Sequence, residues 1–173
     1  AHRLNARGHA ALPTNTEIES ALVAHQSLFG REQHDRHIHE LRHAALAAMQ
    51  LLDEFSPRLV GPVLAGTATH SSPVNLHAFS DTPEAVMMCL AGHGFDVASY
   101  ERRLKSRRDS VVTYPGYRFR LNANTVETTV FTYNGLRQAP ISPVDGRPMR
   151  RATREQVAEL AAPIGKRGQV YFS

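Results

Sequence analysis

Residues 72–77 read Ser-Pro-Val-Asn-Leu-His, and apolar and polar side chains alternate from Val74 to His77. In a β-strand, residues i and i+2 point to the same face, so such a strand gathers Asn75 and His77 on one side. Amide and imidazole groups can hydrogen-bond to phosphate or bind a softer metal, whereas magnesium prefers carboxylate oxygens and water. Asn75 and His77 can therefore contact phosphate or a softer metal, but they cannot neutralise magnesium.

A glycine turn precedes this strand. The apolar run Leu59–Ala65 predicts a first strand that ends at Gly66-Thr67, and a short polar link then leads to Ser72. The hydroxyl and amide of Thr67 and the imidazole of His70 are suited to donate hydrogen bonds to a phosphate. The competing interpretation is that His70 is a loop histidine without a role.

The order of strand, Gly-Thr turn and second strand resembles the opening of the active site in the nucleotidyltransferase fold. DNA polymerase beta, poly(A) polymerases and minimal nucleotidyltransferases share that fold. The resemblance spans roughly residues 40–135, and a proteobacterial branch of the superfamily is similar through Leu59–His77 and Ser142–Ala152. It implies that a nucleotide or an RNA phosphate contacts Gly66, Thr67, His70, Ser72, Asn75 and His77.

The same resemblance implies that the site has lost metal ligands. In the family, an Asp-x-Asp pair holds two magnesium ions about 4 Å apart, which stabilise the attacking and leaving oxygens. That pair aligns either with Pro73 and Asn75 or with Asn75 and His77, and neither alignment retains a carboxylate. We therefore expect Mg²⁺ or Mn²⁺ only together with a bound nucleotide, no metal site formed by the protein alone, and millimolar or weaker magnesium affinity without nucleotide.

A third acidic residue of the family lies on a later strand packed beside the first two, so the resemblance predicts that residues 74–79 and 125–131 are neighbouring strands. The run Thr125–Phe131 alternates β-branched and aromatic residues and predicts a strand, within which Glu127 matches that carboxylate. If the protein is active, the resemblance makes Glu127 its catalytic residue, with Asp81 as a second carboxylate. The alternative interpretation is an ordinary glutamate on the solvent side of the strand.

Basic residues concentrate in one short span of the chain. The formal net charge is +4, with a sequence pI near 9.6. Clustered cations gain affinity for phosphate backbones by releasing counterions, although solvated surface charge is the commoner reason for such clusters. We expect at least one arginine of this span to face the same side of the sheet as Arg118 or Arg120. The candidates for binding nucleic acid are Arg102, Arg103, Lys105, Arg107 and Arg108.

Two histidines raise the question of a separate metal site. His39 and His43 lie one turn apart in a predicted helix, a spacing that can chelate zinc. No His-Glu-x-x-His motif accompanies them, and Glu40 does not occupy the position that such a motif requires. We therefore interpret the pair as solvated residues on a helix face.

The remaining pattern predicts an α+β fold: a nucleotidyltransferase-like mixed sheet flanked by helices, with an N-terminal helical pair. Periodicity and capping boxes that start at Thr14 and Thr153 predict helices over residues 14–29, 31–55, 81–91 and 153–162, with Gly30 ending the first. Alternation predicts strands over residues 59–65, 74–79, 95–104, 111–114, 117–121 and 125–133. The links between the later strands are predicted to be a hairpin link over residues 105–110, a tight turn at Pro115-Gly116 and a hairpin turn over residues 122–124. The chain then divides into an arm with the helical pair, a core and a tail, over residues 1–56, 57–162 and 163–173.

Composition limits the setting in which this fold operates. Cys89 is the only cysteine among 173 residues, which excludes an internal disulfide and fits a reducing cytoplasm. No apolar run approaches the ~20 residues that a membrane helix needs, and no signal peptide is recognisable, so we expect a cytoplasmic protein without a membrane partner.

The leading functional hypothesis is a nucleotidyltransferase-like pseudoenzyme that binds a nucleotide or an RNA phosphate. One alternative is an active nucleotidyltransferase with an atypical metal site. The other is a protein–protein interaction module that retains only the scaffold. The first hypothesis requires nucleotide binding without turnover. The second requires turnover that is lost in Glu127→Gln, and the third predicts neither nucleotide binding nor turnover.

Overall fold

The structure is a computed structural model that describes residues 11–163. The predicted N-terminal arm therefore lies outside the described residues over residues 1–10, and the predicted tail over 164–173. The backbone divides into two compact units, Ala1–Asp35 and Arg36–Ser173. The division falls within the first helix.

That first helix, α1, spans Asn15–Leu51 without interruption. The expected helical pair is wrong, because Gly30 does not end a helix. An interior glycine costs a helix roughly 1 kcal/mol relative to alanine, but it keeps the backbone N–H and causes no clash. The start agrees with the predicted capping box: Thr14 N donates to Glu17 Oε2 over 2.7 Å, and Glu17 N donates to Thr14 Oγ1 over 3.3 Å.

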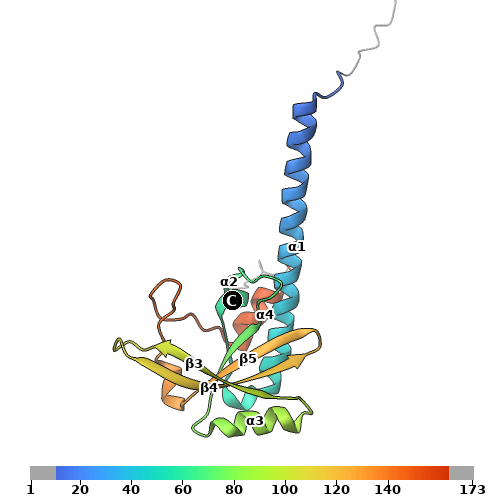
Figure 1. Ribbon diagram of the computed structural model, residues 1–173. Helices are drawn as coiled ribbons and strands as arrows, with labels where there is room; N and C mark the ends of the chain where they lie inside the picture. Colours follow the sequence, from blue (N-terminus) through green and yellow to red (C-terminus); the bar gives the residue numbers. More distant parts are fainter. Residues whose placement is uncertain (1–10, 164–173) are drawn as a thin grey trace, which may run out of the picture. The chain divides into compact units, whose positions relative to one another are not determined.

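The second unit is organised around a five-stranded mixed sheet (Figure 1). The spatial order is β1-β2-β5-β4-β3. The strands are β1 (Arg58–Val60), β2 (Val74–Phe79), β3 (Ala98–Lys105), β4 (Val111–Leu121) and β5 (Asn124–Phe131). Strands β2 and β5 are parallel neighbours, and the other pairs are antiparallel. The predicted α+β class and the predicted pairing of residues 74–79 with 125–131 are thus confirmed.

Buried aliphatic side chains lie between one face of this sheet and helices α1 and α3 (Pro83–Gly92). Strand β2 contributes Val74, Leu76 and Ala78 to the core. Its alternate residues Asn75 and His77 therefore point to the opposite face. That second face carries the polar groups considered below.

The predicted strand over residues 59–65 is wrong beyond Val60. Strand β1 stops there, and Gly61–Ala65 forms the short helix α2 with Pro62 in its first turn. Proline lacks the N–H that a strand ladder needs but is tolerated at a helix start. Gly66 adopts φ +82° and ends α2, so the Gly66-Thr67 turn follows a helix rather than a strand.

The predicted tight turn at Pro115-Gly116 is also wrong, because β4 runs straight through it. Strand β5 pairs only with Gly116–Leu121, so Pro115 has no neighbour on that side that needs its missing N–H. The hairpin link over residues 106–110 and the turn at Asn122, which has φ 55°, follow the prediction.

Short elements complete the described chain. A 3-10 helix, η2 (Tyr133–Arg137), follows β5 and replaces the predicted end of the last strand. Another 3-10 helix, η1 (Asp53–Phe55), lies between α1 and β1. The predicted capping box of Thr153 and Gln156 opens α4 (Arg154–Ala161). No helix within residues 11–163 combines the length and apolar character that crossing a membrane requires.

Candidate functional site

Asn75 and Glu127 face each other across the parallel strands β2 and β5. Arg118 of β4 lies opposite Glu127 on the other side, and its Nε donates to Glu127 Oε1 over 3.0 Å. Arg102 of β3 donates from Nη2 to Glu127 Oε2 over 2.5 Å and from Nη1 to Asn75 Oδ1 over 3.4 Å. We call these four residues the arginine–glutamate cluster. It carries two positive charges and one negative charge.

Tyr100 holds both arginines of the cluster in position. The guanidinium carbons of Arg102 and Arg118 lie 5.0 Å and 5.5 Å from the centre of its ring, within the range of cation–π attraction. The Tyr100 hydroxyl is 2.9 Å from Thr129 Oγ1 on β5, and burial raises its pKa. Gly116 makes room for the ring, because a Cβ there would lie 2.2 Å from Tyr100 Cζ.

The cluster does not fit a pair of magnesium ions. Glu127 is only 8% exposed, and a guanidinium group occupies each of its carboxylate oxygens. Asn75 offers an amide that already contacts Arg102. Within residues 11–163, no three His, Cys, Asp or Glu side chains are grouped so that they could hold a metal ion.

His77 shares the strand face of Asn75 but lies in a separate environment. It is 2% exposed, packs on the Phe131 ring at 4.4 Å, and accepts a hydrogen bond from Arg151 Nε to its Nδ1 over 3.0 Å. Burial, reinforced by Arg151 and Arg102, holds the pKa of His77 well below its usual value, so the ring is neutral at pH 7. A neutral, enclosed imidazole is not available to a ligand.

Arg151 was not among the expected site residues, yet it occupies this part of the sheet face. Its guanidinium carbon lies 4.9 Å from the ring centres of both Phe79 and Phe131, and burial lowers its pKa to about 10. Its Nη1 donates to Gly135 O. A lone arginine in a loop gives no signal in the sequence for such a stacked position.

Asp81, the second carboxylate of the alternative metal set, lies away from Glu127. Glu127 pairs with Asn75 near the start of β2, whereas Asp81 lies beyond the end of that strand at Phe79. The strand from Asn75 to Phe79 alone extends about 13 Å. Asp81 Oδ1 instead accepts a hydrogen bond from Tyr133 N over 3.2 Å. The fold does not bring the two acids together.

The link between α2 and β2 separates the other expected phosphate ligands. Ser72 Oγ accepts a hydrogen bond from Thr69 N over 2.9 Å and so closes the link on itself. His70 is exposed and lies beside His37 of α1, with ring centres 4.9 Å apart, while His37 Nε2 donates to Thr69 O over 3.1 Å. Ser72 and His70 therefore do not join Asn75 in one cluster.

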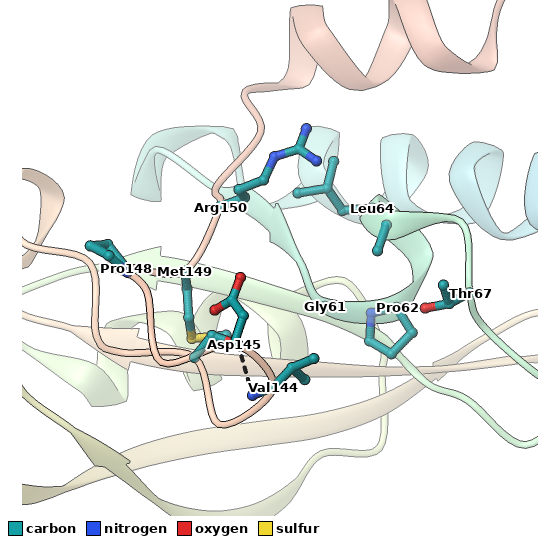
Figure 2. Close-up of a pocket in the computed structure, with 11 residues that line it drawn as sticks. Gly61, Pro62, Leu64, Thr67, Val144, Asp145, Pro148, Met149 and Arg150 are labelled. Atoms are coloured by element: carbon teal, nitrogen blue, oxygen red, sulfur yellow. Dashed lines mark hydrogen bonds between the residues drawn. The ribbon is translucent and has the colours of Figure 1, made fainter.

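A cavity of about 280 Å³ lies between α2 and the loop Ser142–Arg150 (Figure 2). Residues on the α2 side and residues of the loop face each other across it, with Asp145 and Arg150 on the loop side. Its lining combines apolar groups with one carboxylate, one guanidinium and two hydroxyls: Gly61, Pro62, Leu64, Ala65, Thr67, Ser142, Val144, Asp145, Pro148, Met149 and Arg150. Such a mixture is typical of small-molecule sites, although the volume is at the low end.

The cavity adjoins the arginine–glutamate cluster through Gly61. A Cβ built on Gly61 would lie 3.2 Å from Asn75 Nδ2, so the cavity wall contacts a member of the cluster. Arg42 of α1 fixes α2 by donating from Nε to Val63 O and from Nη2 to Leu64 O. Of the expected turn ligands, Thr67 lines the cavity, and Gly66 precedes it at the end of α2.

The basic hairpin carries its charges in two different ways. The expectation that an arginine of β3 shares a face with Arg118 is confirmed, because Arg102 and Arg118 bind one carboxylate. Lys105 pairs with Asp109 over 2.7 Å at the turn, and Arg103, Arg107 and Arg108 are exposed.

The arrangement offers a phosphate-bearing ligand two adjoining environments. Guanidinium groups can donate to an anion, and the cavity can enclose a ring or sugar between apolar walls. The sequence indicated Asn75, Glu127 and Thr67, but neither the two-arginine clamp nor the loop side of the cavity. Comparison of the chain with protein-family models, curated proteins and solved structures found no match.

Proposed function

We propose that this is a nucleotidyltransferase-like protein that binds a nucleotide and does not carry out two-metal catalysis. The observation that carries the proposal is the double engagement of Glu127 by Arg102 and Arg118. A carboxylate in that position is neutralised by its neighbours rather than free to neutralise a metal. The same two arginines leave the sheet face with a net positive charge, which favours an anionic ligand.

The local order of elements supports the choice of a nucleotide. The order of strand, glycine turn, polar link and second strand in the resemblance is retained in part: helix α2 follows β1, and the first glycine turn lies at Gly61 rather than Gly66. The cavity beside Gly61 is large enough for one ring system, and the cluster beyond Asn75 supplies cations for a phosphate. A base or ribose in the cavity and a phosphate toward Arg102 satisfy both environments.

Arg150 and Thr67 are the side chains with which the cavity would bind the polar part of the ligand. Arg150 is the cation in the lining, and Thr67 offers a hydroxyl from the α2 side. Arg147 belongs to the same loop but does not line the cavity, and it contributes its backbone N–H to Asp145 Oδ1 over 2.9 Å. Replacing the Arg147 side chain leaves that hydrogen bond in place and removes the same charge.

Thermal-shift measurements with a panel of nucleotides, each with and without Mg²⁺ or Mn²⁺, test the proposal. We expect at least one nucleotide to raise the melting temperature, with little dependence on the metal, and no label transfer from that nucleotide. Arg150→Ala should weaken binding about tenfold, whereas Arg147→Ala should not change it. Equal effects of both variants would show that only net charge matters and would contradict binding in the cavity.

The same measurements separate the alternative functions. An active nucleotidyltransferase with an atypical metal site should need the metal, transfer label, and lose turnover in Glu127→Gln. A scaffold used only for protein contacts should show neither nucleotide binding nor turnover. Calorimetry that found a tight magnesium site without nucleotide would also contradict the non-catalytic function.

A further inference from the structure

His39 and His43 of α1 bring two imidazole nitrogens close together on the protein surface. Their Nε2 atoms are 3.0 Å apart, and their rings are 72° from coplanar with centres 4.5 Å apart. His43 is exposed and His39 is partly exposed, so both nitrogens are accessible from solvent. No carboxylate forms an ion pair with either histidine among the described residues.

The backbone beneath this pair is held in place by the core. Ile38 and Leu41 are 5% and 3% exposed, and Ala45 is fully buried, so the turn that carries both histidines packs against the sheet. A packed helix keeps residues i and i+4 on one face at a constant separation. The backbone therefore keeps the two side chains adjacent, and a hydrogen bond between their Nε2 atoms brings the nitrogens together; a metal would replace the proton of that hydrogen bond.

We propose that His39 and His43 form a two-histidine binding site for a late divalent transition metal such as Zn²⁺, Ni²⁺ or Cu²⁺. Zn–N bonds are about 2.0–2.1 Å long, so ligand angles between 90° and 110° require nitrogens about 2.9–3.4 Å apart. The observed 3.0 Å falls within that interval. Imidazole is the ligand that suits these metals, whereas magnesium prefers oxygen, so this site is independent of the proposed nucleotide site.

The remaining coordination positions are open. No third His, Cys, Asp or Glu within residues 11–163 joins the pair, so water or an added ligand completes the shell. Two imidazoles bind a metal less tightly than the four ligands of a structural zinc site. Because protons compete for the same nitrogens, metal affinity must fall as the pH drops.

Titration of the untagged full chain with Zn²⁺, followed with a competing chromophoric chelator, tests the proposal. We expect His39→Gln and His43→Gln each to lower the affinity of the site at least tenfold at pH 7.5, and the wild-type affinity to fall at least tenfold by pH 5.5. His25→Gln removes another exposed histidine of α1 and should leave the site unchanged.

Either of two results would overturn the site. One is that the wild-type chain binds no Zn²⁺ at millimolar concentrations. The other is that His39→Gln and His43→Gln bind as the wild type does, which would place the metal on other histidines of the chain. Since His43 is exposed, circular dichroism should show unchanged folding in His43→Gln, so loss of binding there cannot be attributed to unfolding.

Discussion

Glu127 shows how one side chain changes what a sheet face can do. It is buried, and two arginines with 33% and 47% exposed side chains use both of its oxygens. Desolvating a carboxylate is costly, and two hydrogen-bonded guanidinium groups offset that cost. Solvent screens the outer parts of both arginines, so the net stabilisation is smaller than for a fully buried ion pair.

Glu127→Gln should therefore lower the free energy of unfolding by about 1–2 kcal/mol, since it leaves two cations without their shared partner. Urea unfolding measures this change. The exposed Lys105–Asp109 pair provides the control, because Asp109→Asn should change stability by less than about 0.5 kcal/mol. If Glu127→Gln were equally neutral, the cluster would contribute no more than a surface ion pair.

His77 links folding to pH through its burial. Its pKa in the folded protein lies well below the usual value, so the folded protein keeps the ring neutral while the unfolded chain takes up a proton as the pH falls through about 6.5. The unfolded state then binds more protons, and linkage requires the folding stability to decrease. This contribution is fully present above pH 7 and is lost as the pH falls.

His77→Gln should remove that pH dependence while retaining an acceptor for Arg151 Nε. Between pH 7 and pH 5 the wild type should lose up to about 1.4 kcal/mol per pH unit more than the variant. Urea unfolding at several pH values measures the difference. The control is His70→Gln, at an exposed position, which should show the same pH dependence of stability as the wild type. If His77→Gln also showed the wild-type pH dependence, burial of His77 would not be its cause.

Local chemistry predicted the elements whose sequence signals agree with one another. Both capping boxes follow from residues three positions apart in the chain. The pairing of β2 with β5 joins distant segments and was expected from the resemblance. The sequence failed where a single glycine or proline was weighed alone. Pro115 lies inside a strand, because pairing of β4 with its neighbours outweighs one unfavourable residue. Gly30 lies in an exposed part of α1, where one glycine costs the helix roughly 1 kcal/mol but does not end it.

The site was harder to predict than the elements. Alternation placed Asn75 and Glu127 correctly on one face, because it depends only on strand period. The clamp on Glu127 needs Arg102 to reach across β4 from β3, and the cavity needs the loop Ser142–Arg150 to pack beside α2. Both depend on contacts between distant parts of the chain, which local patterns do not specify.

Gly61 is the first residue of α2, and both the cavity and the arginine–glutamate cluster depend on it. It adopts φ +74°, and a Cβ there would lie 3.2 Å from Asn75 Nδ2. Gly61→Ala should therefore lower the free energy of unfolding by roughly 1–2 kcal/mol because of the left-handed conformation, and by about 1 kcal/mol more because Asn75 must move. It should also weaken nucleotide binding.

Gly94→Ala is the matched control for that prediction. Gly94 has φ +88° with nothing within 4 Å of its Cβ position, so it carries the conformational penalty without the contact. Urea unfolding and thermal shift with nucleotide measure both variants. Equal destabilisation with unchanged nucleotide binding would indicate that the Gly61–Asn75 contact contributes nothing to the site.

At the scale of the whole molecule, charge favours anionic partners. The formal net charge is +4, and the hairpin of β3 and β4 concentrates it. Glu127 partly neutralises Arg102 and Arg118, and Asp109 partly neutralises Lys105. The hairpin cations without an ion pair among the described residues are Arg103 and Arg120 on the strands and Arg107 and Arg108 at the tip. Arg107 and Arg108 are exposed there and are free to approach a phosphate backbone.

If RNA binds this hairpin, its affinity should fall steeply between low and physiological salt, because each phosphate contact releases counterions. Replacing Arg107 and Arg108 with alanine should reduce the log–log salt slope by roughly one to two units. Filter binding of a mixed single-stranded RNA at several salt concentrations measures the slope. The control is Arg31→Ala with Arg36→Ala, which removes the same charge from exposed positions of α1. An equal change in slope for both pairs would mean that RNA responds to net charge alone, and no affinity at low salt would mean that the tip is only solvated surface.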